Sequence, residues 1–128
     1  MKVVQELVTY FDRRGKLSRR QLRTMLDDNK IAGDAPTNVQ GLCDVTGSVY
    51  YFRITGVVEG QVWGSGPYTR DSALGAAAVH AGLLKPGATA VLRMTVVPPL
   101  PKYPGTISNG VTTSDYGEFP HCWELSKI

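Results

Sequence analysis

The sequence lacks long apolar runs, and this limits where the protein can work. No uninterrupted hydrophobic stretch approaches the ~20 residues that a membrane-spanning helix needs. Near the N-terminus, Lys2 and Glu6 interrupt the stretch that would be continuously apolar in a secretory signal peptide. We therefore expect a soluble protein with no membrane span that stays in the cytoplasm.

Cysteine and histidine are scarce, which argues against disulfide frameworks and metal sites. The chain has two cysteines, Cys43 and Cys122, and two histidines, His80 and His121. In a reducing cytosol we expect two free, partly buried thiols, and a single disulfide between them is the alternative. The four side chains show no CxxC or HxxxH spacing, so we expect no metal and no cofactor.

The charge of the chain is concentrated in its first quarter. The length of 128 residues suits one domain core with a small appendage. The net charge of the chain is +3. Residues 1–33 hold eight Lys or Arg against four acids, whereas residues 34–128 hold six against seven. A local basic cluster creates the field that a partner would feel, so the N-terminal segment is a candidate for partner contact.

Residues 1–33 are predicted to form a basic helical hairpin. Apolar residues recur at helical spacing before Gly15 and again after Ser18, which can cap a second helix. A short hairpin cannot bury its apolar stripe alone, so we expect contact with a protein partner or self-assembly. Nucleic acid is a less favoured alternative, because the segment offers arginines for phosphates but no recognition helix. The residues expected at the contact are Leu7, Phe11, Arg19, Arg20 and Arg23.

Residues 48–128 are predicted to form one α+β domain, reached through a linker at residues 34–47. The aromatic and β-branched residues after Ser48 are typical of a strand. Asn109-Gly110 is a strong signal for a tight turn. The predicted strands are residues 48–54, 61–63, 89–97 and 121–125, the first two joined as a hairpin through Glu59-Gly60.

Residues 71–81 are predicted to form a helix on which His80 is the only strongly polar group beyond the first turn. Thr69 or Asp71 can cap its start, and Gly82 suits a left-handed C-terminal cap. A helix without a polar face must be covered on several sides. The residues expected to be buried between strands are Leu74, Ala77, Ala78 and Ala81.

Separated motifs of this core, in this order, resemble the LCCL domain family. They are Val62-Trp63-Gly64, Tyr68-Thr69, Asp71-Ser72, residues 78–82, Gly105, Asn109-Gly110-Val111 and Tyr116-Gly117. The resemblance covers residues 61–125 and implies a central helix embraced by strands. It also implies a non-catalytic recognition module for lipid, lipopolysaccharide or glycan. Because Gly75 stands where animal members carry a disulfide cysteine, the chain resembles the cysteine-poor bacterial members.

Two groups of core residues are candidates for ligand contact. Trp63, Tyr68 and Arg70 can line a pocket in which a cation meets an anionic head group or a ring stacks on a sugar. The loop of residues 102–118 can form a binding rim, since loops on a rigid scaffold often carry function. Both groups have a structural alternative, in which they only pack the core or form a turn. The rim residues are Tyr103, Asn109, Asp115 and Tyr116.

His80 is the one titratable group beyond the first turn of the predicted helix, and we interpret it as a hydrogen-bonded structural residue. Ser72 and His80 are eight residues apart, roughly 12 Å along a helix axis, so they cannot act as nucleophile and base. A hydrolase or transferase that uses His80 and Asp115 is the third alternative. We therefore predict a non-enzymatic binding or assembly module of the cytoplasm.

Overall fold

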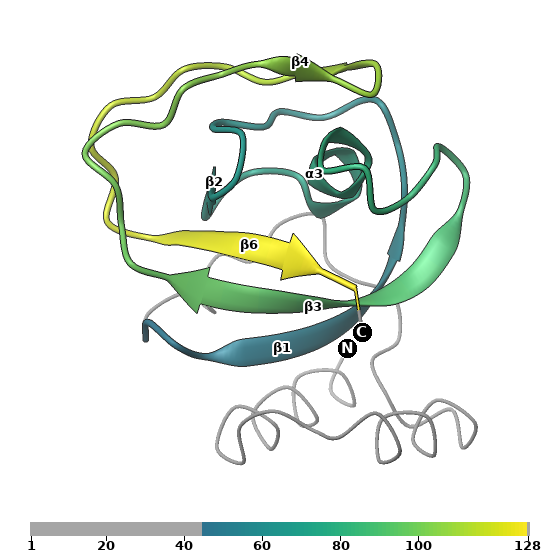
Figure 1. The fold of residues 1–128 in the computed structure, drawn as a ribbon, viewed down its shortest axis with the longest axis horizontal. Coiled ribbons are helices and arrows are strands. Elements are labelled where there is room, and N and C mark those ends of the chain that lie inside the picture. The colour runs from purple at the N-terminus through teal and green to yellow at the C-terminus, as the bar shows by residue number, and fades with distance from the viewer. Residues whose placement is uncertain (1–44, 128) are drawn as a thin grey trace.

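The computed structural model describes residues 45–127, and these residues form an α+β fold (Figure 1). The elements are β1 (Val49–Thr55), β2 (Tyr68–Thr69), α3 (Leu74–His80), β3 (Thr89–Val97), β4 (Ile107–Ser108), β5 (Val111–Thr112) and β6 (Cys122–Ser126). The predicted fold class is confirmed for this part of the chain. The helical hairpin predicted at residues 1–33 lies outside it. Within residues 45–127, no helix is long and apolar enough to cross a membrane.

An antiparallel sheet with the strand order β1-β3-β6-β2 forms the base of the fold. The predicted hairpin between residues 48–54 and 61–63 is wrong. β1 pairs with β3 over its whole length, and Trp63 makes only an isolated bridge with Ser114. Five of the seven residues of β1 are buried, so a nine-residue partner satisfies its backbone where a three-residue segment cannot.

The helix α3 lies between this sheet and the β4–β5 hairpin, as Figure 1 shows. It contacts β1 on one side and β4 and β5 on the other. Its middle residues, Ala76, Ala77 and Ala78, have no exposed surface. Because alanine is small, the helix backbone can approach both layers closely.

The start of α3 differs from the prediction. The helix begins at Leu74, and Ala73 occupies the cap position without a side-chain hydrogen bond, so the caps predicted at Thr69 or Asp71 are wrong. Thr69 Oγ1 instead donates to Asp71 Oδ1 at 2.9 Å and is hydrogen-bonded to Ser72 Oγ at 3.1 Å. These side chains satisfy one another in the turn before the helix, which leaves none for capping.

The end of α3 is the predicted glycine cap. Gly82 has a φ of 77°, and its N–H donates to Val79 O at 2.9 Å. Leu83 N donates to Ala78 O at 3.0 Å, which completes a Schellman motif. Burial of Ala78, like that of Leu74 and Ala77, is confirmed, but the predicted burial of Ala81 is wrong. Ala81 is the C-cap residue, where the chain already turns away from the core.

The predicted tight turn at Asn109-Gly110 joins β4 to β5. Asn109 has a φ of 52° and Gly110 a φ of 82°, the two positive values that a type I′ turn requires. The Asn109 Nδ2 donates to His80 O at 3.1 Å. The turn is therefore anchored to the C-terminal end of α3.

Candidate functional site

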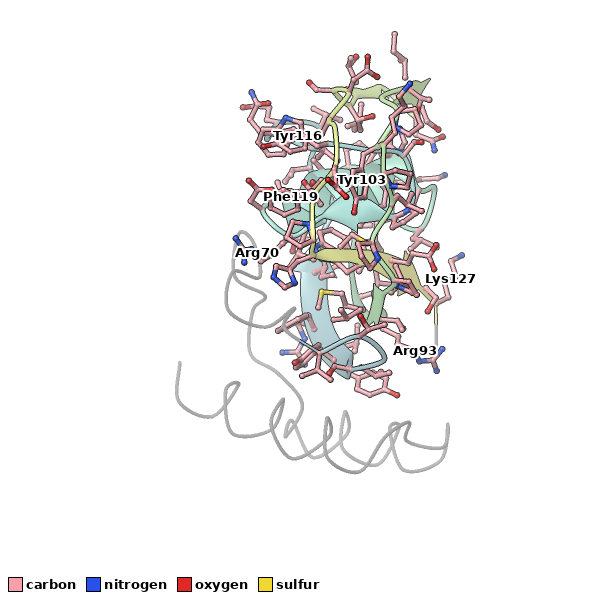
Figure 2. All side chains as sticks on the ribbon, turned by 90° about the vertical axis from the view of Figure 1, so that its left-hand side faces the viewer. Arg70, Arg93, Tyr103, Tyr116, Phe119 and Lys127 are labelled. Atoms are coloured by element: carbon pink, nitrogen blue, oxygen red, sulfur yellow. The ribbon has the colours of Figure 1, made fainter. Side chains whose placement is uncertain are left out.

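Three aromatic side chains and one arginine form a continuous row, which we call the aromatic row. The ring centroids of Trp63 and Tyr116 are 6.4 Å apart, and those of Tyr116 and Phe119 are 5.5 Å apart, both with edge-to-face geometry. The Arg70 guanidinium carbon lies 5.6 Å from the centroid of the Phe119 ring. Figure 2 shows Tyr116, Phe119 and Arg70 in this order along one side of the molecule.

The backbone of Arg70 is held firmly, while its side chain is not fully satisfied. Arg70 N donates to His121 O at 2.9 Å, and Trp123 Nε1 donates to Arg70 O at 3.3 Å. Among the described residues, Arg70 Nε is buried and has no hydrogen-bond partner. A buried donor without a partner costs free energy. The Arg70 guanidinium is therefore a candidate for contact with a ligand.

A hollow of about 460 Å³ adjoins the aromatic row at Tyr116. Its lining residues are Lys102, Pro104, Asp115, Tyr116 and Gly117. Asp115 Oδ1 accepts a hydrogen bond from Gly105 N at 2.6 Å, which fixes the carboxylate at the loop. Tyr116 and Asp115 of the predicted rim therefore lie together.

Tyr103, the other aromatic residue of the predicted rim, lies in the core rather than at the surface. Its hydroxyl donates to Phe119 O at 2.8 Å and accepts from Leu100 N at 3.1 Å. Burial raises the pKa of Tyr103 to about 12. The side chain thus holds the loop that carries Phe119, and only through that loop does it contribute to the aromatic row.

Tyr68 is not part of the aromatic row, so the predicted trio of Trp63, Tyr68 and Arg70 is not brought together as one pocket. The Tyr68 side chain is buried against Trp123, with ring centroids 5.4 Å apart. Its hydroxyl is hydrogen-bonded to His80 Nδ1 at 3.0 Å. Burial, with a smaller effect of Glu124, raises the pKa of Tyr68 to about 12.

His80 is the centre of a buried polar network. Besides the Tyr68 contact, His80 Nε2 is 2.9 Å from Thr106 Oγ1. Burial lowers the pKa of His80, and a smaller effect of Thr106 opposes this shift. The predicted hydrogen-bonded role is confirmed. Since both ring nitrogens have partners, His80 forms no hydrogen bond with Asp115, and the acid–base pair of the third alternative is not assembled.

A second, polar hollow of about 510 Å³ opens beside this network. Its lining residues are Ser65, Gly66, Tyr68, His80, Ala81, Thr106, Ser108, Glu124 and Leu125. Hydroxyl groups, one imidazole and one carboxylate dominate its wall. We call it the β6 hollow, because Glu124 and Leu125 belong to that strand.

Cys122 is a free, buried thiol, as predicted, and Cys43 lies outside the described residues. The Cys122 Sγ donates to Val97 O and Pro98 O, each at 3.4 Å. Burial raises the pKa of Cys122. The thiol therefore packs the end of β6 and takes no part in either hollow.

Sequence reasoning missed Phe119 and Thr106, which complete the aromatic row and the His80 network. Phe119 lies between turn residues, where an aromatic side chain gives no periodic signal. It does, however, follow Tyr116 within three residues, and clustered loop aromatics are a usable indication of a binding surface. Thr106 had no signal, because its partner His80 is 26 residues away.

A model of a known protein family matches more than half of the chain. The family model described as the LCCL domain matches residues 22–121, which confirms the resemblance. The matched segment begins well before the motifs at residues 61–125 and therefore includes β1. No curated protein matches the chain.

Proposed function

The chain belongs to the LCCL domain family, and from that membership we propose that it is a non-enzymatic binding module that recognises an anionic head group at Arg70. The observation that carries this proposal is the guanidinium of Arg70 stacked on Phe119, with a buried Nε that no described residue satisfies. The chemistry recognised is a phosphate or carboxylate on a lipid or a glycan.

The setting of Arg70 favours recognition of an anion by a preorganised fork of donors. Its backbone is fixed by hydrogen bonds to His121 and Trp123, and its side chain rests on an aromatic face. A guanidinium held in this way loses little entropy when it forms two parallel hydrogen bonds with a carboxylate or phosphate. Arginine therefore suits the site better than lysine would.

The aromatic row supplies the neighbouring contacts for the rest of such a ligand. Tyr116 is exposed, and its ring lies between Trp63 and Phe119. Aromatic faces of this kind pack against sugar rings or against the apolar part of a lipid head region. We infer that charge is read at Arg70 and that the ring or chain beyond it is read at Tyr116.

The experiment measures binding of the full chain to vesicles of phosphatidylcholine with added phosphatidylglycerol, and to an array of acidic and neutral glycans. Removing charge-assisted hydrogen bonds worth about 1.5–3 kcal/mol predicts at least tenfold weaker binding for Arg70→Gln. Arg70→Lys keeps the charge and should recover only part of the loss. The matched control is Lys127→Gln, which removes an exposed cation far from Arg70 in Figure 2. Equal effects of Arg70→Gln and Lys127→Gln, or no binding at all, would contradict the proposal.

A second candidate function is protein contact or self-assembly through residues 1–33, supported by the uneven charge and the apolar spacing of that segment. Its proposed contact residues are Leu7, Phe11, Arg19, Arg20 and Arg23. The test is the mass of the full chain in solution by light scattering, with Leu7→Asp and Phe11→Asp. A lower mass, or loss of co-purified partners, supports this candidate, whereas an unchanged mass and unchanged partners count against it.

We also propose that the module works in the cytoplasm and leaves its ligand chemically unchanged. The free thiol of Cys122 suits a reducing compartment, and the occupied ring nitrogens of His80 support the lack of catalysis. Cell fractionation tests the location. Mass spectrometry of a bound lipid or glycan after prolonged incubation tests the second point, since any cleaved or modified product contradicts it.

A further inference from the structure

The strand β6 has an edge that β2 covers only in part. β2 pairs with β6 through Tyr68↔Trp123 and Thr69↔Cys122, and the chain before Tyr68 bends away. β6 itself continues to Ser126. Within residues 45–127, the last three residues of the strand therefore have no strand neighbour on that side.

The pairing of β3 shows which residues of β6 direct their backbone N–H and C=O groups toward β3. Gly47 N donates to Val96 O and Val96 N donates to Ser48 O, so the backbone of Val96 faces β1. Backbone groups alternate between the two edges of a strand, and Thr95 therefore faces β6. Since Thr95 pairs with Glu124, the N–H and C=O of Glu124 are directed toward β3.

The β2 side of the sheet gives the same alternation. Arg70 N donates to His121 O, so His121 faces the β2 edge, and two and four residues later Trp123 and Leu125 do so as well. Trp123 is paired with Tyr68, but no residue of 45–127 pairs with Leu125 on this edge. One main-chain donor and one acceptor of Leu125 are thus presented at the margin of the β6 hollow.

The β6 hollow has the size and polarity to receive a side chain of a segment that pairs with this edge. Its volume of about 510 Å³ is within the range of sites that hold ligands. Tyr68, Thr106 and Ser108 contribute hydroxyls to its wall. The only charged side chain of the lining residues is Glu124, and none of them is Lys or Arg. This charge favours a basic side chain in the hollow.

We propose that an extended segment of a partner protein adds to the sheet at Leu125, in line with β2, and places a Lys or Arg side chain in the β6 hollow beside Glu124. Paired main-chain N–H and C=O groups are matched by another peptide backbone rather than by a lipid or a sugar. β2, itself an extended segment on this same edge, shows the geometry that the partner would continue. The hollow and the aromatic row share no residue, so this site is independent of the anion site at Arg70.

The experiment follows the amide of Leu125 in the isotope-labelled full chain by NMR. The probes are pools of blocked pentapeptides, each pool with one fixed central residue and all residues varied elsewhere. We expect the lysine and arginine pools to shift the Leu125 resonance and to slow the hydrogen exchange of its amide. A matched set of pools with N-methylated backbone amides should have no effect, because methylation removes the donors that pair with Leu125.

Glu124→Gln tests the charge of the hollow without disturbing the core, since the side chain is exposed. We expect it to reduce the preference for basic over glutamine pools by about two- to fivefold, the effect of one exposed ion pair. Glu118→Gln, another exposed carboxylate that does not line the hollow, should leave the preference unchanged. The proposal is overturned if no pool affects Leu125 at millimolar concentration, if N-methylated pools act equally, or if shifts occur only in the aromatic row. Loss of anion binding by Arg70→Gln would leave the result at Leu125 unaltered.

Discussion

The hydroxyl oxygen of Tyr68 lies 3.0 Å from Nδ1 of His80, and this contact joins β2 to the last turn of α3. The other imidazole nitrogen reaches Thr106, the residue before β4. One side chain therefore connects the sheet, the helix and the hairpin above it. His80 is 4% exposed and Tyr68 is 2% exposed, so the bond between them lies largely out of contact with bulk water.

Tyr68→Phe is predicted to destabilise the protein, because it leaves a buried nitrogen of His80 without a partner. The expected loss is about 1–3 kcal/mol in the free energy of unfolding, measured by urea denaturation. The control is Tyr116→Phe, which removes a hydroxyl from an exposed side chain and should cost less than about 0.5 kcal/mol. Equal losses in the free energy of unfolding for the two variants would show that the hydrogen bond between Tyr68 and His80 does not stabilise the protein.

The stability is predicted to decrease as the pH falls below 6.5, and His80 contributes to the decrease. Burial lowers the pKa of His80 from its ordinary value of 6.5, so just below that pH the unfolded chain binds a proton that the folded chain does not. Proton uptake by the unfolded state lowers the free energy of unfolding, whereas above pH 6.5 the contribution is fully retained.

The measurement is the free energy of unfolding of wild type and His80→Gln between pH 5 and pH 8, at about one-unit steps. The glutamine variant is less stable overall but should show a flatter dependence on pH, because it lacks the titrating ring. NMR titration of the His80 ring protons checks the direction of the pKa shift independently. Parallel curves for the two proteins would exclude His80 as a source of the pH dependence.

Features encoded by a few adjacent residues were predictable from the sequence. The glycine cap at Gly82 and the tight turn at Asn109-Gly110 both need positive φ values, and such positions select glycine or asparagine directly. The all-apolar pattern of α3 likewise indicated its central position. The fold class followed from these local signals.

Features that depend on distant partners were not predictable. β1 pairs with β3, about forty residues further on, and nothing in the composition of β1 distinguishes this partner from the nearer residues 61–63. Distant partners also decide the roles of Tyr68 and Arg70. These residues are two positions apart, yet the Tyr68 side chain reaches His80 and the Arg70 side chain reaches Phe119. The candidate site therefore needed the structure, although Trp63, Arg70 and Tyr116 were among the residues predicted to contact a ligand.

Gly75→Ala is predicted to destabilise the protein even though alanine is the better helix former. A Cβ atom at Gly75 would lie 2.6 Å from the backbone oxygen of Thr55 and 2.9 Å from Cγ2 of Val57. The backbone oxygen cannot move without distorting the end of β1, so the clash should outweigh the roughly 1 kcal/mol gained in helix propensity. We expect a net loss of about 1–3 kcal/mol by urea denaturation.

The control for this substitution is Gly117→Ala, where no atom lies within 4 Å of the added Cβ. We expect a change of less than about 0.5 kcal/mol for the control. A Gly75→Ala protein as stable as wild type would mean that α3 and β1 can separate at this point. The same contact explains why a cysteine at this position would require a different path of the chain around Thr55.

Asn109 is predicted to stabilise the fold in two separable ways, through its backbone conformation and through its side chain. Its φ of 52° suits asparagine and glycine, and its side-chain Nδ2 donates to His80 O at 3.1 Å. Asn109→Gly keeps the left-handed backbone and removes the hydrogen bond, so it should cost about 1 kcal/mol. Asn109→Ala removes the bond and adds the strain of a left-handed alanine, so it should cost about 2–3 kcal/mol.

The ratio of these two losses decides what the turn does for the His80 network. If the hydrogen bond from Asn109 to His80 O holds the β4–β5 hairpin against α3, Asn109→Gly should also increase hydrogen exchange of the amides around Thr106, whose hydroxyl is bonded to the His80 ring. If Asn109→Gly is neutral in both measurements, the turn needs only its backbone geometry. The hairpin would then be held on the helix by the buried side chain of Val111 and by the bond from Thr106 to His80.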